Sequence, residues 1–79
     1  MENGITYTVE KLSIKDAIWY GANVECYIVR YSNGFAPIEK FASLDSKGRY
    51  THNSKKGYIH GNGNLGTHAM LLTNLKNLN

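Results

Sequence analysis

The residues that could bind or transform a ligand gather in the second half of the chain. All three histidines lie there, at positions 52, 60 and 68, and residues 46–79 also contain five bases and no acid. The first 45 residues hold four bases and six acids, so they carry a net charge of −2 against +5 for the rest. A basic segment of this kind indicates an anionic partner, which can be a nucleic acid or an acidic protein surface.

Two short runs that begin at residues 49 and 58 are expected to pair as a polar hairpin across a loop of five residues. This pairing sets His52 opposite Tyr58 and Tyr50 opposite His60. Because side chains alternate along paired strands, all four rings would project from one face. The arrangement depends on the register, and a slip of one residue would scatter the four rings over both faces.

This expected surface has the composition of a nucleic-acid-binding site. Tyrosine and histidine rings stack on exposed bases, each worth about 1–3 kcal/mol, while lysine and arginine neutralise phosphates. The alternative is that the two tyrosines are core residues and the lysines are solvated turn residues. The candidate partner-binding residues are Lys47, Arg49, Tyr50, His52, Lys55, Lys56, Tyr58 and His60.

The same residues allow a catalytic alternative, a small metal-free ribonuclease. One of His52 and His60 would accept the proton of a 2′-hydroxyl, and the other would protonate the leaving 5′-oxygen. Imidazole suits both roles because it changes protonation state near neutral pH. A lysine of the hairpin tip, Lys56 or Lys55, would stabilise the charge on the phosphorane.

No metal or cofactor is expected. The eight-residue spacing of the histidines fits no common zinc pattern, and residues 46–79 supply neither Cys nor an acid as a further ligand. Gly61, Gly63 and Gly66 match G-x-G-x-x-G, but a dinucleotide site needs an acid about 20 residues further on. Only 13 residues follow Gly66. The motif is therefore interpreted as a connecting loop, with phosphate binding at a following helix start as the alternative.

Local patterns predict the elements that would position these residues. Residues 5–13 alternate as a half-buried strand does, and Ser13 can cap a short helix that ends near Gly21. Residues 24–31 and 35–44 are expected to form a central hairpin, because Asn33-Gly34 suits a type I′ turn. From Thr67 onward, leucines at positions 71, 75 and 78 favour an amphipathic helix, with a strand over residues 69–72 as the alternative.

The single cysteine, Cys26, cannot form an internal disulfide and falls on an expected central strand, so it is interpreted as a buried apolar residue in a reducing compartment. The first residues have no basic segment followed by an apolar run, so no signal peptide is expected. No stretch approaches the length of about 20 apolar residues that spans a membrane. A cytoplasmic protein is predicted. Trp19 is expected in the core, or at a protein interface if it is exposed.

Together these patterns predict a single compact domain over residues 1–79 of the α+β class. It would have a small antiparallel sheet of about four to five strands in two hairpins, one short helix after the first strand and a C-terminal helix. The favoured function is a non-enzymatic binding module that occludes a nucleic acid or the acidic surface of a nucleic-acid-handling protein. By analogy of size and composition, an inhibitor from a phage or another mobile element fits. The alternatives are the ribonuclease that uses His52 and His60, and an oligomeric interaction subunit.

Overall fold

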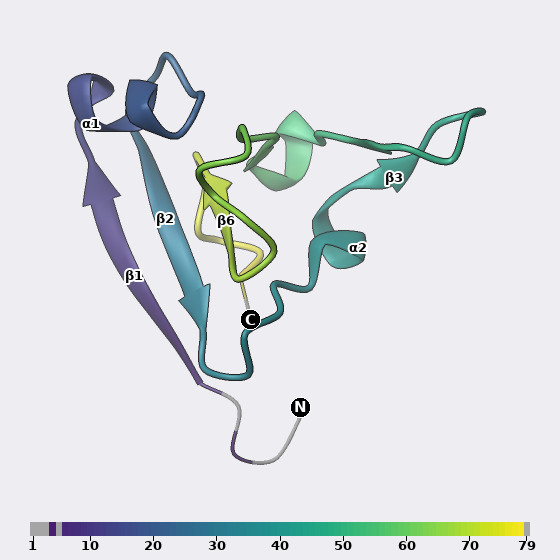
Figure 1. Ribbon diagram of the computed structural model, residues 1–79, viewed down its shortest axis with the longest axis horizontal. Coiled ribbons are helices and arrows are strands. Elements are labelled where there is room, and N and C mark those ends of the chain that lie inside the picture. The colour runs from purple at the N-terminus through teal and green to yellow at the C-terminus, as the bar shows by residue number, and fades with distance from the viewer. Residues whose placement is uncertain (1–3, 5, 79) are drawn as a thin grey trace.

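The computed structural model describes residue 4 and residues 6–78, which form a four-stranded sheet and a small hairpin that extends from it (Figure 1). Two short α-helices and one 3-10 turn connect the strands. The elements are β1 (Tyr7–Leu12), α1 (Ile14–Trp19), β2 (Cys26–Tyr31), α2 (Ile38–Phe41), β3 (Ser43–Leu44), β4 (Tyr50–Thr51), η1 (Ser54–Lys56), β5 (Tyr58–Ile59) and β6 (Ala69–Leu72).

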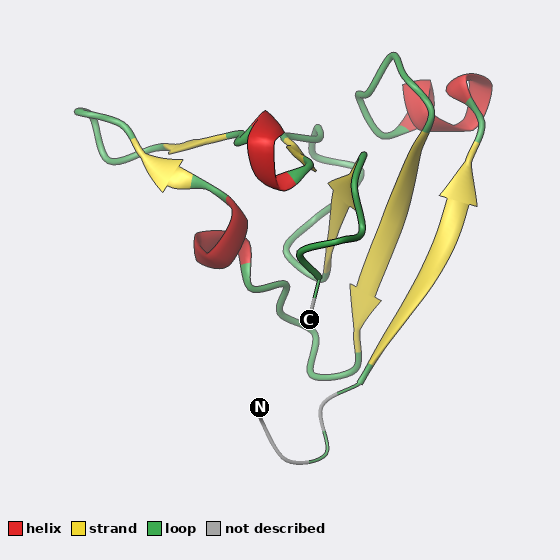
Figure 2. Ribbon diagram, turned by 180° about the vertical axis from the view of Figure 1, so that it is seen from behind, coloured by secondary structure: helices red, strands yellow, loops and turns green. Residues whose placement is uncertain are grey.

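The larger sheet has the strand order β1-β2-β6-β5, and each neighbouring pair is antiparallel. Among the described residues, β3 and β4 pair only with each other. Figure 2 shows this hairpin reaching away from the long β1–β2 ribbon. The predicted α+β class with a small antiparallel sheet is confirmed. The longest helix in the described part of the chain, α1, has six residues, and none there is long and apolar enough to cross a membrane.

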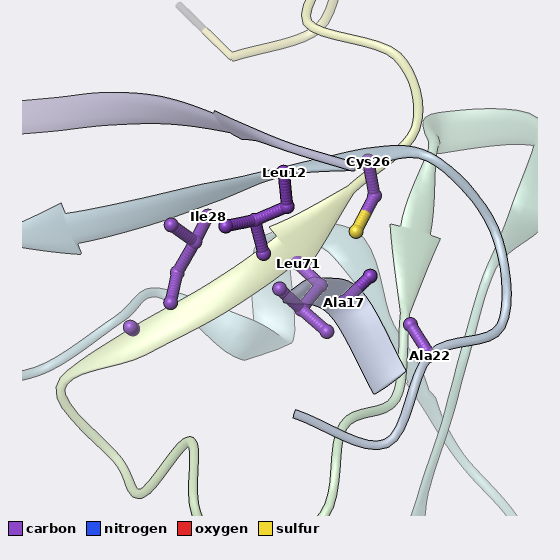
Figure 3. Close-up of a cluster of buried hydrophobic side chains, with 7 residues drawn as sticks. Leu12, Ala17, Ala22, Cys26, Ile28 and Leu71 are labelled. Atoms are coloured by element: carbon purple, nitrogen blue, oxygen red, sulfur yellow. The ribbon is translucent and has the colours of Figure 1, made fainter. Parts of the chain in front are cut away.

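Apolar side chains cover both faces of the sheet. On one face, Ile28 and Leu71 pack with Leu12, and Ala17 of α1 packs against the same cluster (Figure 3). Cys26 belongs to this cluster and is buried, as predicted. We call these residues the first cluster.

The second cluster lies on the opposite face and has a larger aromatic component. It is formed by Val29, Phe41, Ala42, Tyr58, Met70, Leu72 and Leu78. Successive residues of β2 and β6 alternate between the two clusters, which is why both strands are apolar on both faces. Because the cores lie on both sides of β2 and β6, these two strands form the centre of the fold.

The helix after the first strand begins as predicted. Ser13 is its N-cap, and its Oγ accepts a hydrogen bond from the backbone N–H of Asp16 at 3.3 Å. The acid at this position also lies in the first helical turn, where the positive end of the peptide dipoles stabilises a carboxylate. The helix ends at Trp19, shortly before Gly21, which adopts a positive φ.

The predicted hairpin between residues 24–31 and 35–44 is wrong. A turn does occur, since the N–H of Gly34 donates to the carbonyl of Tyr31 at 3.1 Å, but Asn33 does not adopt the positive φ that a type I′ turn requires. The chain then diverges from β2. Pro37, which has no N–H to donate to a ladder, precedes helix α2 instead.

The predicted C-terminal helix is also wrong, and the alternative strand is confirmed. Residues 69–72 form β6, which fills the second edge of β2 and pairs Ile28 with Leu71. All four residues of β6 are buried, as expected for a central strand with a core on each face. Leu75 and Leu78 still reach the second cluster, but from a non-helical tail.

Candidate functional site

A groove lies between the β3–β4 hairpin and the residue that follows β5. It encloses ≈ 490 Å³ and is lined by Asp45, Arg49, Tyr50, Thr51, His52 and His60. Five of these six residues come from the β3–β4 hairpin and the residue after it, and the sixth, His60, directly follows β5. We call this hollow the arm groove, and residues 43–51 the arm.

Asp45 shapes the turn of the arm. Its Oδ1 accepts hydrogen bonds from the backbone N–H groups of Lys47 at 2.8 Å and Arg49 at 2.9 Å, and its backbone N–H donates to the carbonyl of Arg49. These contacts, with the N–H of Arg49 first, lower the pKa of the Asp45 carboxyl against a smaller opposing effect of desolvation. The turn therefore holds a carboxylate, and Gly48 supplies the positive φ that closes it.

Arg49 forms an ion pair with the carboxylate of Asp45. Its Nε is 3.4 Å from Oδ2 of Asp45, and its side chain is 71% exposed. An ion pair this exposed contributes little to stability, because water screens both charges. A phosphate in the arm groove could therefore recruit the guanidinium at small cost.

The two rungs of the arm expose their side chains. Leu44 lies opposite Tyr50, and both are exposed, at 60% and 41%. In the second rung, Thr51 Oγ1 donates to the carbonyl of Ser43 at 3.1 Å. Backbone pairing and these polar contacts hold the arm in shape, so the ring of Tyr50 is available at the groove.

The 3-10 turn η1 redirects the chain between the arm and β5. Asn53 caps it by accepting from the N–H of Lys55, and Gly57 ends it with a φ of 85°. Tyr58 follows and enters the second cluster with 3% of its surface exposed, and burial raises the pKa of its hydroxyl. The structure therefore does not place Tyr58 on the predicted binding surface.

The pairing that was predicted to bring the histidines together is wrong. β4 pairs with β3, and β5 pairs with β6, so residues 50–52 and 58–60 form no common hairpin. His52 and His60 nevertheless line the same arm groove, because η1 and the turn at Gly57 fold the chain back. His68 lies elsewhere, beside Gly34.

The predicted lysines take different positions around this site. Lys47 is in the turn of the arm, and Lys55 is on η1 without a side-chain partner among the described residues. Lys56 instead donates from Nζ to the carbonyl of Lys40 at 3.3 Å. None of these three lysines lines the groove.

The glycine-rich loop closes the end of helix α1. The N–H of Asn62 donates to the carbonyl of Tyr20 at 2.9 Å, and Nδ2 of Asn64 donates to the carbonyl of Trp19 at 2.8 Å. A Cβ on Gly61 would lie 3.0 Å from that Tyr20 oxygen, so glycine permits the close approach. This loop is a structural connector and not a dinucleotide fingerprint.

Helix α1 carries exposed apolar side chains, among them Trp19. Trp19 is 67% exposed, and Ile14 and Ile18 beside it on the helix are exposed as well. Trp19 was expected in the core because a domain this small usually buries its tryptophan, and the structure places this side chain at the surface instead. Its exposure makes it a protein-interface candidate.

Within residues 4 and 6–78, no three side chains of the metal-binding types His, Cys, Asp and Glu lie close enough to hold an ion.

Comparison of the chain with protein-family models, curated proteins and solved structures found no match.

Proposed function

We propose that the protein is a non-enzymatic binding module that holds single-stranded nucleic acid in the arm groove. The observation that carries this proposal is the lining of the groove, where Tyr50, His52 and His60 supply rings and Arg49 supplies a guanidinium. Rings of this kind stack on bases, and arginine pairs with phosphate. Binding in this groove would occlude the nucleic acid from other proteins.

A single strand fits these features better than a duplex. Stacking on a protein ring requires a base that has left its own stack, which loops and single strands provide. The arm is a two-rung hairpin and presents its ring at the side of an open groove, with Lys47 in the adjoining turn. Lys47 and Lys55 add positive charge beside the groove residues in the chain.

The charge near the groove sets the expected salt dependence. Engagement of Lys47, Arg49 and Lys55 on phosphates of a single strand would give a slope of log K against log salt of about −2. Asp45 opposes binding less than a free carboxylate would, because two backbone N–H groups already donate to its Oδ1.

The test is fluorescence anisotropy with labelled single-stranded RNA and DNA over a range of salt concentrations. Tyr50→Ala removes the ring from the groove, and binding should weaken by about fivefold to a hundredfold. Leu44→Ala is the matched control, because it truncates the residue opposite Tyr50 in the same rung but outside the groove. Absence of binding at low salt, or equal losses in both variants, would refute the proposal and favour a protein partner.

One observation favours a second candidate, the metal-free ribonuclease. His52 and His60 line the same groove, as an acid–base pair would require. The cation that shares the groove with them is Arg49, whereas Lys56 contacts the backbone of Lys40. Gel analysis of the same RNA in EDTA separates the candidates: cleavage that disappears in both His52→Ala and His60→Ala identifies an enzyme, and intact RNA excludes one.

A further inference from the structure

A second hollow, which we call the loop pocket, adjoins the arm groove. It encloses ≈ 300 Å³ and is lined by residues of the glycine-rich loop 61–66 together with Ile38, Tyr58, His60 and Ala69. His60 also lines the arm groove, so the two hollows meet at this ring. A volume of this size is at the lower end of the range for ligand sites and suits one small ring system.

The hydroxyl of Tyr58 has no hydrogen-bond partner among the described residues, although only 3% of this residue is exposed. No fully enclosed side-chain oxygen or nitrogen of the described residues lacks a partner, so the Tyr58 oxygen keeps access to solvent. Because Tyr58 lines the loop pocket, its hydroxyl can donate to, or accept from, a group placed there. The ring is held in the second cluster, so little freedom is lost when the hydroxyl binds.

The lining of the loop pocket favours a base over a phosphate. None of the described residues that line it is Lys, Arg, Asp or Glu, whereas Arg49 and Asp45 line the arm groove. Apolar surface comes from Ile38, Leu65 and Ala69. A phosphate would lose water here without gaining a positive charge, and a neutral ring with polar edges would not have this cost.

Two side-chain groups are left to recognise such a ring. The side chain of Asn62 is already engaged, since its Oδ1 accepts from the N–H of Asn64 at 2.8 Å and its Nδ2 donates to the carbonyl of Trp19 at 3.5 Å. The hydroxyl of Tyr58 and the imidazole of His60 form no hydrogen bond with the described residues. Both can therefore bond to the edge of a base.

We propose that the loop pocket holds one base of the single strand whose neighbouring base stacks on Tyr50 in the arm groove, with the strand passing His60. This inference rests on the proposed function, and the ring that the two hollows share supplies the continuity that a strand requires. Its consequence is a base preference. Stacking on Tyr50 accepts every base, whereas a fixed hydroxyl at Tyr58 discriminates between base edges.

The first test measures the anisotropy of short labelled RNA strands of A, C or U alone at low salt. Wild-type protein should bind one of them severalfold more tightly than the others. Tyr58→Phe should weaken that strand by about twofold to tenfold and narrow the differences, without a loss of stability in urea, because the hydroxyl has no protein partner. Tyr31→Phe is the matched control and should bind as wild type, since it removes the hydroxyl of a half-buried tyrosine that lines neither hollow.

The outcomes separate this inference from the function on which it rests. Tyr50→Ala should weaken all three strands by a similar factor. If Tyr50→Ala weakens binding while the three strands bind equally and Tyr58→Phe matches wild type, the loop pocket holds no base, and the proposal for the arm groove stands. If no strand binds, the proposed function itself fails, and this inference fails with it.

The second test uses nucleosides, which carry a base but no phosphate. Their titration at millimolar concentration should shift the amide NMR signals of Gly63 and Gly66, which line the loop pocket. Tyr58→Phe should require a higher concentration for the same shifts. Inorganic phosphate is the control probe and should leave these signals unchanged, because the pocket has no cation. Absence of shifts in the loop with every nucleoside, or equal shifts with phosphate, would overturn the inference.

Discussion

Gly57→Ala should destabilise the protein strongly, because the backbone at this position has neither the conformation nor the space for a side chain. Gly57 has a φ of 85°, and an added Cβ would lie 2.7 Å from the N, O and Cβ atoms of Asn74. The left-handed conformation costs a residue with a Cβ about 1–2 kcal/mol. Two of the clashing atoms are backbone, so relief requires movement of the chain.

That movement would break other contacts at the same position. The carbonyl of Gly57 accepts hydrogen bonds from the N–H of Thr73 at 2.7 Å and from its hydroxyl at 3.2 Å, which fixes the C-terminal segment against the turn. Overpacking in a constrained site costs about 1–3 kcal/mol. The conformational and steric effects together predict a loss of about 2–5 kcal/mol in the free energy of unfolding.

Gly48→Ala is the matched control for this substitution. Gly48 has a φ of 79°, close to that of Gly57, but no atom lies within 4 Å of an added Cβ. It should lose only the conformational part, about 1–2 kcal/mol. The difference between the two variants, about 1–3 kcal/mol, therefore measures the clash with Asn74.

Urea unfolding followed by far-ultraviolet circular dichroism measures both losses. Tryptophan fluorescence is less suitable, since Trp19 is largely exposed in the folded state. Equal midpoints for the two alanine variants would show that the Asn74 contact does not constrain Gly57. The turn that brings His60 to the arm groove would then have another origin.

Three further predictions concern the arm, the core and the glycine-rich loop. Hydrogen bonding lowers the pKa of the Asp45 carboxyl below its ordinary value of 3.8, so the carboxylate stabilises the arm turn fully above pH 3.8 and loses this effect as the pH falls through the lowered pKa. Amide chemical shifts of the turn that change above pH 5 would contradict this prediction. Burial raises the pKa of the Cys26 thiol, so a thiol reagent should modify the folded protein only as fast as it unfolds, and modification as rapid as in urea would contradict the buried position. Asn64→Ala should lower the free energy of unfolding by about 1 kcal/mol, because it removes the hydrogen bond from Nδ2 to the carbonyl of Trp19 in helix α1. Asn23→Ala is the control and should not change the melting temperature, since the Asn23 side chain forms no hydrogen bond in the described chain.

Features with a local cause were predictable from the sequence. The alternation before Ser13 predicted a strand, which β1 confirms, although the strand is not half-buried, because five of its six residues are exposed. The cap at Ser13 requires only its own hydroxyl and a nearby N–H group. The burial of Cys26 followed from an apolar run that is too uniform for an exposed strand. Each of these inferences depends on a window of a few residues.

Strand pairing could not be predicted, because it is a competition between distant segments. β2 is apolar on both faces and can accept a neighbour at either edge. The segment after Gly34 was the nearest candidate, but β6, 38 residues or more along the chain from β2, occupies that edge and buries all four of its side chains. The leucines of the tail favour a helix by spacing, and the strand forms instead because residues 69–72 fill the open edge of β2.

Half of the predicted partner-binding residues line the arm groove, namely Arg49, Tyr50, His52 and His60, but the geometry that was predicted to join them is wrong. His52 and His60 were expected together through a shared hairpin, whereas the structure joins them through η1 and Gly57. Tyr58 was expected on one exposed face with His60 because the two share a parity; both line the loop pocket, but the Tyr58 side chain is not exposed. β5 ends at Ile59, so the alternation stops before His60, and Tyr58 is buried in the second cluster instead.

The arm groove is formed by two separate parts of the molecule, and this division allows its shape to be changed through one of them. Five lining residues belong to the arm or follow it directly, and the strands of the arm pair only with each other. Gly48 at its turn faces open space. Insertions in this turn would lengthen the hairpin and reshape the groove without altering the four-stranded sheet, so the dimensions of the groove can be re-engineered independently of the fold.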